Sequence, residues 1–458
     1  MVVLQSISFA NYALTTKTTN IIYGSAPYLT FDGGRTRVTN TEALLGITLS
    51  DGRIFTPTTN NSSSTNPIEL PVEGQSFADI GMLVPTDTNS IALSSLIGTP
   101  YNYWGDDDGD GQGIDGITAT GSLNLSIVDK NNRAVARNEV LTSCNSPYKL
   151  TLSNSEGRLT TRYGVPNESR FNAGNATYYI NPKAAPAICY ARPRLFINLA
   201  APSPAAIYDW HNGFLPQSVT PSSYGLNFPT TGANNLYFDL KLGGVSQALS
   251  WARVSQGGIT ATMTDSTNTS VKVPLTGPAV TDPNQWYSDN PSRIARPSLP
   301  QVFELVGRDS SGNAVVKYGF ELKQWFVNRG PGFYNYSSVE SWCNKIGGYR
   351  VPNVRDLTNA SCRQSNIGVC ENYANEINAL TATPSAPVNL FMRHIGGGLF
   401  SEWGMVEDYV GINFPLHHFY CWTQDRSGSS QMFFAVNSTG IVYNKAYTDS
   451  IFGLCVYP

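Results

Sequence analysis

Short runs in which apolar and polar residues alternate, separated by clusters of turn residues, limit most strongly how this chain can fold. In SLNLSIVD, Leu123, Leu125 and Ile127 recur at every second position, which makes one face of an extended segment apolar, as in a half-buried strand. In VFELVGRDSSGNAVVKYGFELKQWF, two β-rich runs flank the turn residues 309–313, and this arrangement predicts a hairpin. The pattern therefore predicts a mainly β protein.

The composition agrees with many strands and turns rather than long helices. Charged residues make up only 14% of the chain, while Gly, Pro and Tyr number 41, 28 and 24, a mixture that favours strands and turns. The net charge of −3 gives no electrostatic reason to expect nucleic acid or an anionic membrane as a partner. No apolar run reaches the roughly 18 residues that a membrane-spanning helix requires.

Three modules are predicted: an all-β domain with an acidic Asp-rich loop (1–205), an immunoglobulin-like β-sandwich (206–330) and an α+β domain (331–458). The Pro-rich stretch AAPSPAAIYDW from Ala200 indicates the first boundary. Beyond it, strands every ten or so residues favour the sandwich. In the last module, Ser337 and Glu340 form a capping box ahead of a helical period, and Asn353 is expected to cap a second helix.

The cysteines and the start of the chain indicate in which cellular compartment the protein folds. The seven cysteines form no CxxC pair, and the four histidines do not complete a zinc pattern, so we expect disulfides formed in an oxidising compartment, with one thiol left over. The start, MVVLQSISFANYALTT, lacks the basic and apolar regions of a signal peptide. If the protein is exported, we expect this chain to be a segment of a larger one.

An acidic loop is the sharpest local motif. Its spacing matches the first, third, fifth and seventh ligand positions of an EF-hand-type calcium loop, and Asp115 is a further candidate; the predicted Ca²⁺ ligands are Asp106, Asp108, Asp110, the Gln112 carbonyl and Asp115. The pattern departs from that loop at Ile117, where a bidentate Glu is expected. The alternative is a solvated acidic turn, and bound calcium would have a structural role.

Several blocks in the last half of the chain resemble one family: GITATMT, VPLTGP, FELVGRDSSGNAVVKYGFELKQWFVNRG, SWCNKIGGYRVPNVRDLTNA, IGGGLFSEWG and YCWTQD. They are similar to the passenger regions of intimin/invasin-type inverse autotransporters, especially invasin E and SinH-like adhesins. The resemblance covers about residues 227–458. It implies an immunoglobulin-like module followed by a C-type-lectin-like tip, and display on the bacterial outer membrane through a β-barrel outside this chain. It also implies binding of a host-cell surface protein or glycan, or of neighbouring cells, without catalysis.

The resemblance also gives Cys343 and Cys455 the placement of the long disulfide in C-type-lectin-like folds, the alternative being two buried thiols. Cys362 and Cys370 fall within one loop, so a local bond between them is expected. Cys144 and Cys189 are the only cysteines of the predicted first domain and should pair if either does. Cys421 is then left over, although it competes for either loop cysteine.

Aromatic residues in the irregular stretch 384–415 are the predicted receptor contacts: Phe391, Trp403, Tyr409 and Phe414. Two other functions stay open. A calcium-dependent lectin is weakly indicated by Trp422-Thr423-Gln424-Asp425, but the E-P-N or Q-P-D tripeptide that accompanies this motif is absent. A secreted carbohydrate-active enzyme would need facing carboxylates, for which Glu402, Glu407 and Asp408 are candidates, although a structural role suits them better.

Overall fold

The computed structural model describes residues 23–109, 116–194, 200–412, 414, 419–428 and 431–458. The chain forms two compact units, which divide between Ala184 and Ala185. Within the described part, no helix is long and apolar enough to cross a membrane.

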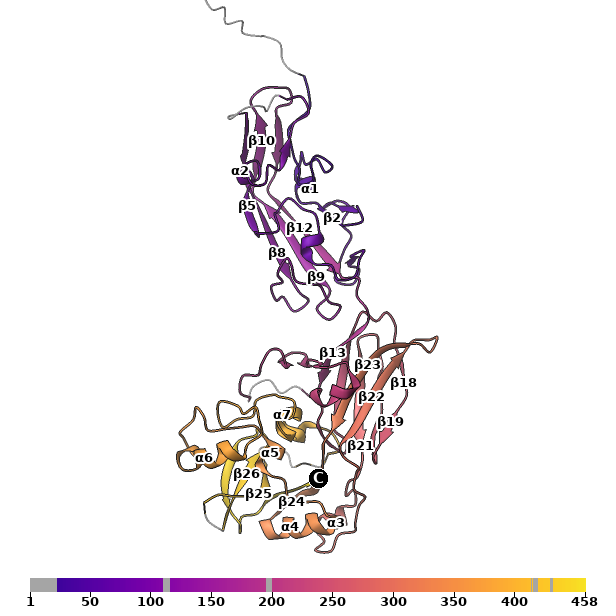
Figure 1. Ribbon diagram of the computed structural model, residues 1–458, viewed down its shortest axis with the longest axis vertical. Coiled ribbons are helices and arrows are strands. Elements are labelled where there is room, and N and C mark those ends of the chain that lie inside the picture. The colour runs from indigo at the N-terminus through magenta and orange to yellow at the C-terminus, as the bar shows by residue number, and fades with distance from the viewer. Residues whose placement is uncertain (1–22, 110–115, 195–199, 413, 415–418, 429–430) are drawn as a thin grey trace, which may run out of the picture. The chain divides into compact units, whose positions relative to one another are not determined.

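The first unit is built around one five-stranded sheet and several smaller ones (Figure 1). The five-stranded sheet has the order β4 (Ile68–Glu69), β12 (Gly174–Asn181), β9 (Tyr148–Asn154), β8 (Ser122–Val128) and β5 (Ser90–Ala92). A three-stranded sheet has the order β11 (Glu168–Phe171), β10 (Gly157–Thr161) and β7 (Ile117–Thr120). The remaining elements are the pairs β1 (Tyr28–Leu29) with β6 (Trp104–Gly105) and β2 (Ile47–Thr48) with β3 (Ile54–Phe55), and the short helices α1 (Thr41–Leu44), η1 (Phe77–Asp79) and α2 (Leu93–Leu96).

Alternation along β8 explains how this sheet buries one face. Leu123, Leu125 and Ile127 are buried, whereas Asn124 and Ser126 between them are exposed. Antiparallel pairing places Leu125 opposite Leu152 of β9, and such cross-strand apolar pairs stabilise a sheet. The predicted strand is therefore present, with its apolar face in the core of the unit.

The second unit begins with an immunoglobulin-like sandwich. One sheet has the order β14 (Tyr208–Asp209), β15 (Gly213–Phe214), β13 (Ala187–Arg192), β17 (Tyr237–Gly243), β21 (Ser270–Thr276), β20 (Ile259–Ala261) and β19 (Val254–Gln256). The other consists of β18 (Ser250–Trp251), β22 (Gln301–Arg308) and β23 (Ala314–Leu322). Their inner faces meet where Phe238 of β17 packs edge-on against Phe320 of β23, with ring centroids 5.8 Å apart. The predicted hairpin is confirmed, since β22 and β23 pair antiparallel around the turn at 309–313.

An α+β region follows and completes the unit. Its six-stranded sheet has the order β16 (Thr231–Ala233), β24 (Gln324–Tyr334), β28 (Ile451–Tyr457), β25 (Tyr420–Arg426), β26 (Met432–Asn437) and β27 (Val442–Ala446). The helices of the second unit are η2 (Pro221–Leu226), α3 (Pro283–Trp286), α4 (Tyr336–Lys345), α5 (Val354–Leu357), α6 (Cys370–Leu380), α7 (Leu399–Trp403) and η3 (Val406–Asp408). Both α3 and α4 contact β24 (Figure 1). The predicted fold class is confirmed as mainly β, with a β-sandwich followed by an α+β region.

The two predicted helix starts have different outcomes. Asn353 caps α5 in a capping box with Asp356, as predicted. Helix α4 is instead capped by Asn335, whose side chain accepts a hydrogen bond from the Ser338 amide. Asn serves as an N-cap as well as Ser does, so the helix begins at Tyr336 and Ser337 lies inside its first turn.

The division into units differs from the three predicted modules. Strand β13 lies before residue 205 but pairs with β17 of the sandwich, so the second unit begins at Ala185. Near residue 330 the chain runs through β24 without a break, and one hydrophobic core contains residues of both the sandwich and the α+β region. The sandwich and the α+β region therefore form a single packed body.

Candidate functional site

Two disulfides tie the α+β region together. Cys343 of α4 is bonded to Cys455 of β28, 112 residues later, and Cys362 is bonded to Cys370 at the start of α6. Cys421 is a buried free thiol. The bond between Cys144 and Cys189 stays a prediction; these two cysteines belong to different units.

The four predicted receptor contacts lie in the interior of the second unit. Phe391, Trp403, Tyr409 and Phe414 are each at most 7% exposed. The Trp403 indole donates a hydrogen bond to the Thr231 carbonyl, and Phe414 stacks on Phe452 with ring centroids 5.0 Å apart. They therefore act as core residues in this conformation, because tertiary packing uses large aromatic rings to fill the interior. Among the described residues of this stretch, Val410 is a large apolar residue that is exposed, at 84%.

A buried carboxylate holds this stretch against the start of β16. Glu402 of α7 is fully buried and accepts hydrogen bonds from the amides and hydroxyls of Thr230 and Thr231 and from the Gly396 amide, at 2.6–3.1 Å. Burial raises the pKa of Glu402 above its ordinary value. The hydrogen-bond donors act in the opposite direction but do not offset the effect of burial. Five donors on one carboxylate satisfy its acceptor capacity, so Glu402 has a structural role here.

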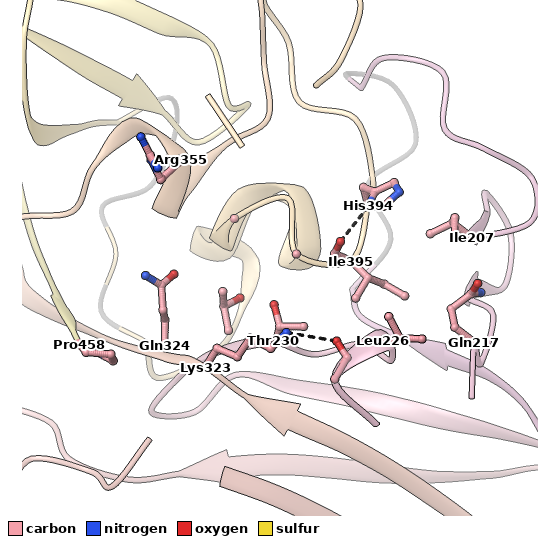
Figure 2. Close-up of a pocket in the computed structure, with 14 residues that line it drawn as sticks. Ile207, Gln217, Leu226, Thr230, Lys323, Gln324, Arg355, His394, Ile395 and Pro458 are labelled. Carbon is pink, nitrogen blue, oxygen red and sulfur yellow. Dashed lines mark hydrogen bonds between the residues drawn. The ribbon is translucent and has the colours of Figure 1, made fainter. Parts of the chain in front are cut away.

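Thr230, Thr231 and Gly396, which Glu402 joins, form part of the walls of a cleft of about 610 Å³. The residues lining it come from four stretches of the second unit: Ile207, Gln217, Gly225, Leu226, Thr230 and Thr231; Lys323 and Gln324; Arg355; and His394, Ile395, Gly396 and Gly398, with Pro458 beside them. Figure 2 shows Arg355 and Gln324 on one side of the cavity, and His394, Ile395 and Leu226 on the other. The volume is within the roughly 300–1,000 Å³ of ligand-binding sites.

The stretch Trp422–Asp425, which weakly indicated a calcium-dependent lectin, makes structural contacts. Trp422 is buried and donates its indole hydrogen to the Tyr334 carbonyl. The Asp425 carboxylate accepts a hydrogen bond from the Val354 amide at the start of α5, and burial raises its pKa. Both side chains thus hold the module together.

Only part of the acidic loop lies in the described residues: Asp106, Asp107 and Asp108 do, whereas Asp110, Gln112 and Asp115 lie outside them. Asp107 is paired with Arg37 and also accepts a hydrogen bond from the Tyr28 hydroxyl. Asp108 accepts one from the Ser25 amide at 2.9 Å. The described residues include no cluster of three or more metal-ligating side chains, and calcium binding stays a prediction.

If calcium binds here, millimolar CaCl₂ should raise the melting temperature of the full chain. The departure from the EF-hand pattern suggests a dissociation constant of about 0.1–1 mM, as in extracellular calcium modules, so binding should be detectable by calorimetry. The Asp110→Asn variant should lose most of the shift, while Asp51→Asn, in another loop, should keep it. Equal melting temperatures with calcium and with EDTA would support the acidic-turn alternative.

Glu407 is a second buried carboxylate, with no hydrogen-bond donor of good geometry in the described part of the chain. Burial raises its pKa from 4.5 to about 7, and the Asp408 carboxylate adds to the rise. Between these two values the folded protein holds a proton that the unfolded chain has released. Stability should therefore fall as the pH rises through this window.

Replacing Glu407 with glutamine should remove this penalty. The shift corresponds to about 3 kcal/mol at about 1.4 kcal/mol per pKa unit, so Glu407→Gln should be more stable than the wild type above pH 7 and no more stable below pH 4. Urea unfolding at a series of pH values measures this difference, with Glu376→Gln on the exposed side of α6 as control. A difference that does not depend on pH would contradict the assignment.

Sequence reasoning missed the cleft because its residues carry no shared motif. They are far apart in the sequence and meet only when β24, α5 and the segment before α7 pack together. The nearest signal was the block IGGGLFSEWG, which contains Gly396 and Glu402, but it indicated a family rather than a cavity.

The comparisons with known proteins find likeness only among solved structures. No protein-family model and no curated protein matches the chain. The structure of invasin, described as a bacterial integrin-binding protein, aligns with 75% of this chain at 12% identity and a TM-score of 0.34. The chain spans about half of that structure, 52% of its length.

Two intimin structures are also similar. A C-terminal 282-residue fragment of intimin, in complex with the intimin-binding domain of the translocated intimin receptor, aligns over 74% of this chain and 93% of its own, at 11% identity and a TM-score of 0.32. An intimin mutant of EHEC O157:H7 aligns over 50% and 89%, at 14% identity and a TM-score of 0.28. At these identities and TM-scores the likeness does not indicate a function. The function has to be inferred from the chain's own residues.

Proposed function

We propose that this chain is the displayed, non-catalytic part of a bacterial surface adhesin whose C-type-lectin-like tip binds a protein on host cells. In this proposal the protein is exported and anchored in the outer membrane by a β-barrel outside this chain. The sandwich supports the tip, and the contact surface lies on the tip and on the part of the sandwich beside it.

The observation that carries the proposal is the single core shared by the sandwich and the α+β region. Binding surfaces work best on a rigid scaffold, and three features make this scaffold rigid: the continuous strand β24, the Cys343–Cys455 bond and the donors around Glu402. Among the carboxylates considered for a glycosidase, Glu402 does not favour catalysis, since it is enclosed by structural donors. The sequence blocks that resemble intimin/invasin-type adhesins lie in this same unit.

Binding of the fluorescently labelled full chain to a panel of host cell types tests the proposal. We expect saturable binding that unlabelled chain competes away. Treating the cells with protease should abolish this binding, whereas enzymatic removal of surface glycans should leave it intact.

The opposite pattern, loss with the glycans and survival after protease, would replace the protein receptor with a glycan. Absence of saturable binding on every cell type and on bacteria displaying the chain would contradict the adhesin proposal itself.

A further inference from the structure

The cleft in the second unit has a marked imbalance of charge. Its described lining includes the basic residues Lys323, Arg355 and His394 and no Asp or Glu side chain. Pro458 also lines the cleft, and its backbone oxygen is already engaged by Arg350 at 2.9 Å. The carboxylates just behind it are already engaged. Asp356 accepts hydrogen bonds from Arg350 at 2.6 Å and from Gln324 at 2.8 Å, and Glu402 is enclosed by five donors.

Neighbouring carboxylates neutralise the positive charges of Arg355 and Lys323 only weakly. Arg355 is exposed and makes no ion pair within 4.0 Å in the part of the chain that the structure describes. Asp425 lies near enough to interact with Arg355, but its carboxylate already accepts a hydrogen bond from the Val354 amide. Lys323 is half exposed and lies 3.9 Å from Glu321, a separation at which a surface pair contributes little. The cleft therefore presents positive charge to a ligand.

The other side of the cavity contains apolar side chains next to His394 and Gln217 (Figure 2). Leu226 is 57% exposed, and Ile395 lies near it, across the cavity from Arg355 (Figure 2). No aromatic side chain is among the described lining residues. A sugar ring would thus lack the stacking partner that aromatic side chains usually supply, whereas a peptide with a carboxylate and an apolar side chain matches both sides.

We propose that the cleft bordered by Leu226, Lys323, Arg355 and Ile395 binds an acidic peptide segment of the receptor protein. The inference rests on the proposed adhesin function and adds the place and chemistry of its contact. The carboxylate of the segment lies beside Lys323 and Arg355, and its apolar side chain lies against Leu226 and Ile395. Glu402 acts as a positioning residue, because it fixes Thr230 and Gly396 in the walls.

The test uses the full chain and a fluorescent pool of ten-residue peptides that contain two Glu and two Leu among Gly and Ser. A matched pool has Gln in place of Glu. We expect anisotropy to show binding of the Glu pool that weakens as salt increases, and weaker binding of the Gln pool. The Lys323→Ala/Arg355→Ala variant should lose about tenfold or more in affinity, and Leu226→Ser should also bind less tightly.

The Lys317→Ala/Arg308→Ala variant is the matched control, since it removes the same charge from exposed positions on β22 and β23 outside the cleft. Equal loss in this control, equal binding of the two pools, or stronger competition by a sulfated oligosaccharide than by any peptide would overturn the proposal. Melting temperatures equal to that of the wild type establish that each variant is folded.

Cell binding of the same variants separates this inference from the adhesin proposal. If the wild type binds cells and the Lys323→Ala/Arg355→Ala variant binds equally well, the adhesin proposal stands and the cleft is not its contact. If the wild type binds no cells, the adhesin proposal fails, and the peptide titration still decides whether the cleft binds acidic segments.

Discussion

Replacing Glu402 with alanine is expected to lower the free energy of unfolding of the second unit by about 3–5 kcal/mol, the range found when a buried charge-assisted network loses one member. The amides of Thr230, Thr231 and Gly396 and the two threonine hydroxyls all donate to this carboxylate. Without it, five buried donors lose their acceptor, and each unsatisfied group costs about 1–3 kcal/mol when no water reaches it. Urea unfolding followed by tryptophan fluorescence measures the change.

Two further variants separate the causes of this loss. Glu402→Gln keeps the size of the side chain but turns one acceptor into a donor, so it should lose most of the same stability. Glu376→Ala, at an exposed position of α6, should stay within about 0.5 kcal/mol of the wild type. If Glu402→Gln is as stable as the wild type, the carboxylate is not the group that holds the walls together.

The sequence was sufficient to predict those elements whose structure is determined by residues close together in the chain. Leu123, Leu125 and Ile127 alternate in the sequence and are buried on one face of β8. The turn at 309–313 sets the hairpin of β22 and β23 through its own residues. The start of α5 at Asn353 follows from a capping box that spans four residues. In each case the physical cause lies within a few residues of its effect.

Features that depend on distant partners could not be predicted in the same way. The period of the strand β13 says nothing about its partner, and its pairing with β17 places it in the sandwich. The aromatic residues Phe391 and Trp403 fit a binding surface and a core equally well by type, and only tertiary packing shows that they are buried. Trp403, for example, contacts Phe228 and Thr231 of β16. Glu402 was a candidate catalytic acid by residue type, but four of its five donors lie 171–172 residues earlier in the chain.

The two disulfides of the α+β region offer a comparison in which loop length is the main difference. The Cys343–Cys455 bond closes a loop of 112 residues, and the Cys362–Cys370 bond closes one of 8. In the chain-entropy model, cross-linking lowers the entropy of the unfolded chain more for longer loops, by about 4–5 kcal/mol for the first bond and about 2–3 kcal/mol for the second. All four side chains are buried, so packing losses in the two double variants should be similar.

We therefore expect Cys343→Ala/Cys455→Ala to destabilise the second unit by about 2 kcal/mol more than Cys362→Ala/Cys370→Ala does. Urea unfolding of both variants under oxidising conditions gives the two values. Cys421→Ala under the same conditions controls for the loss of a buried sulfur without a bond. If the two double variants lose equal stability, constraint of the unfolded chain is not what the long bond contributes. Its effect would then come from contacts in the folded state, where Cys455 pairs with Val327 across β24 and β28.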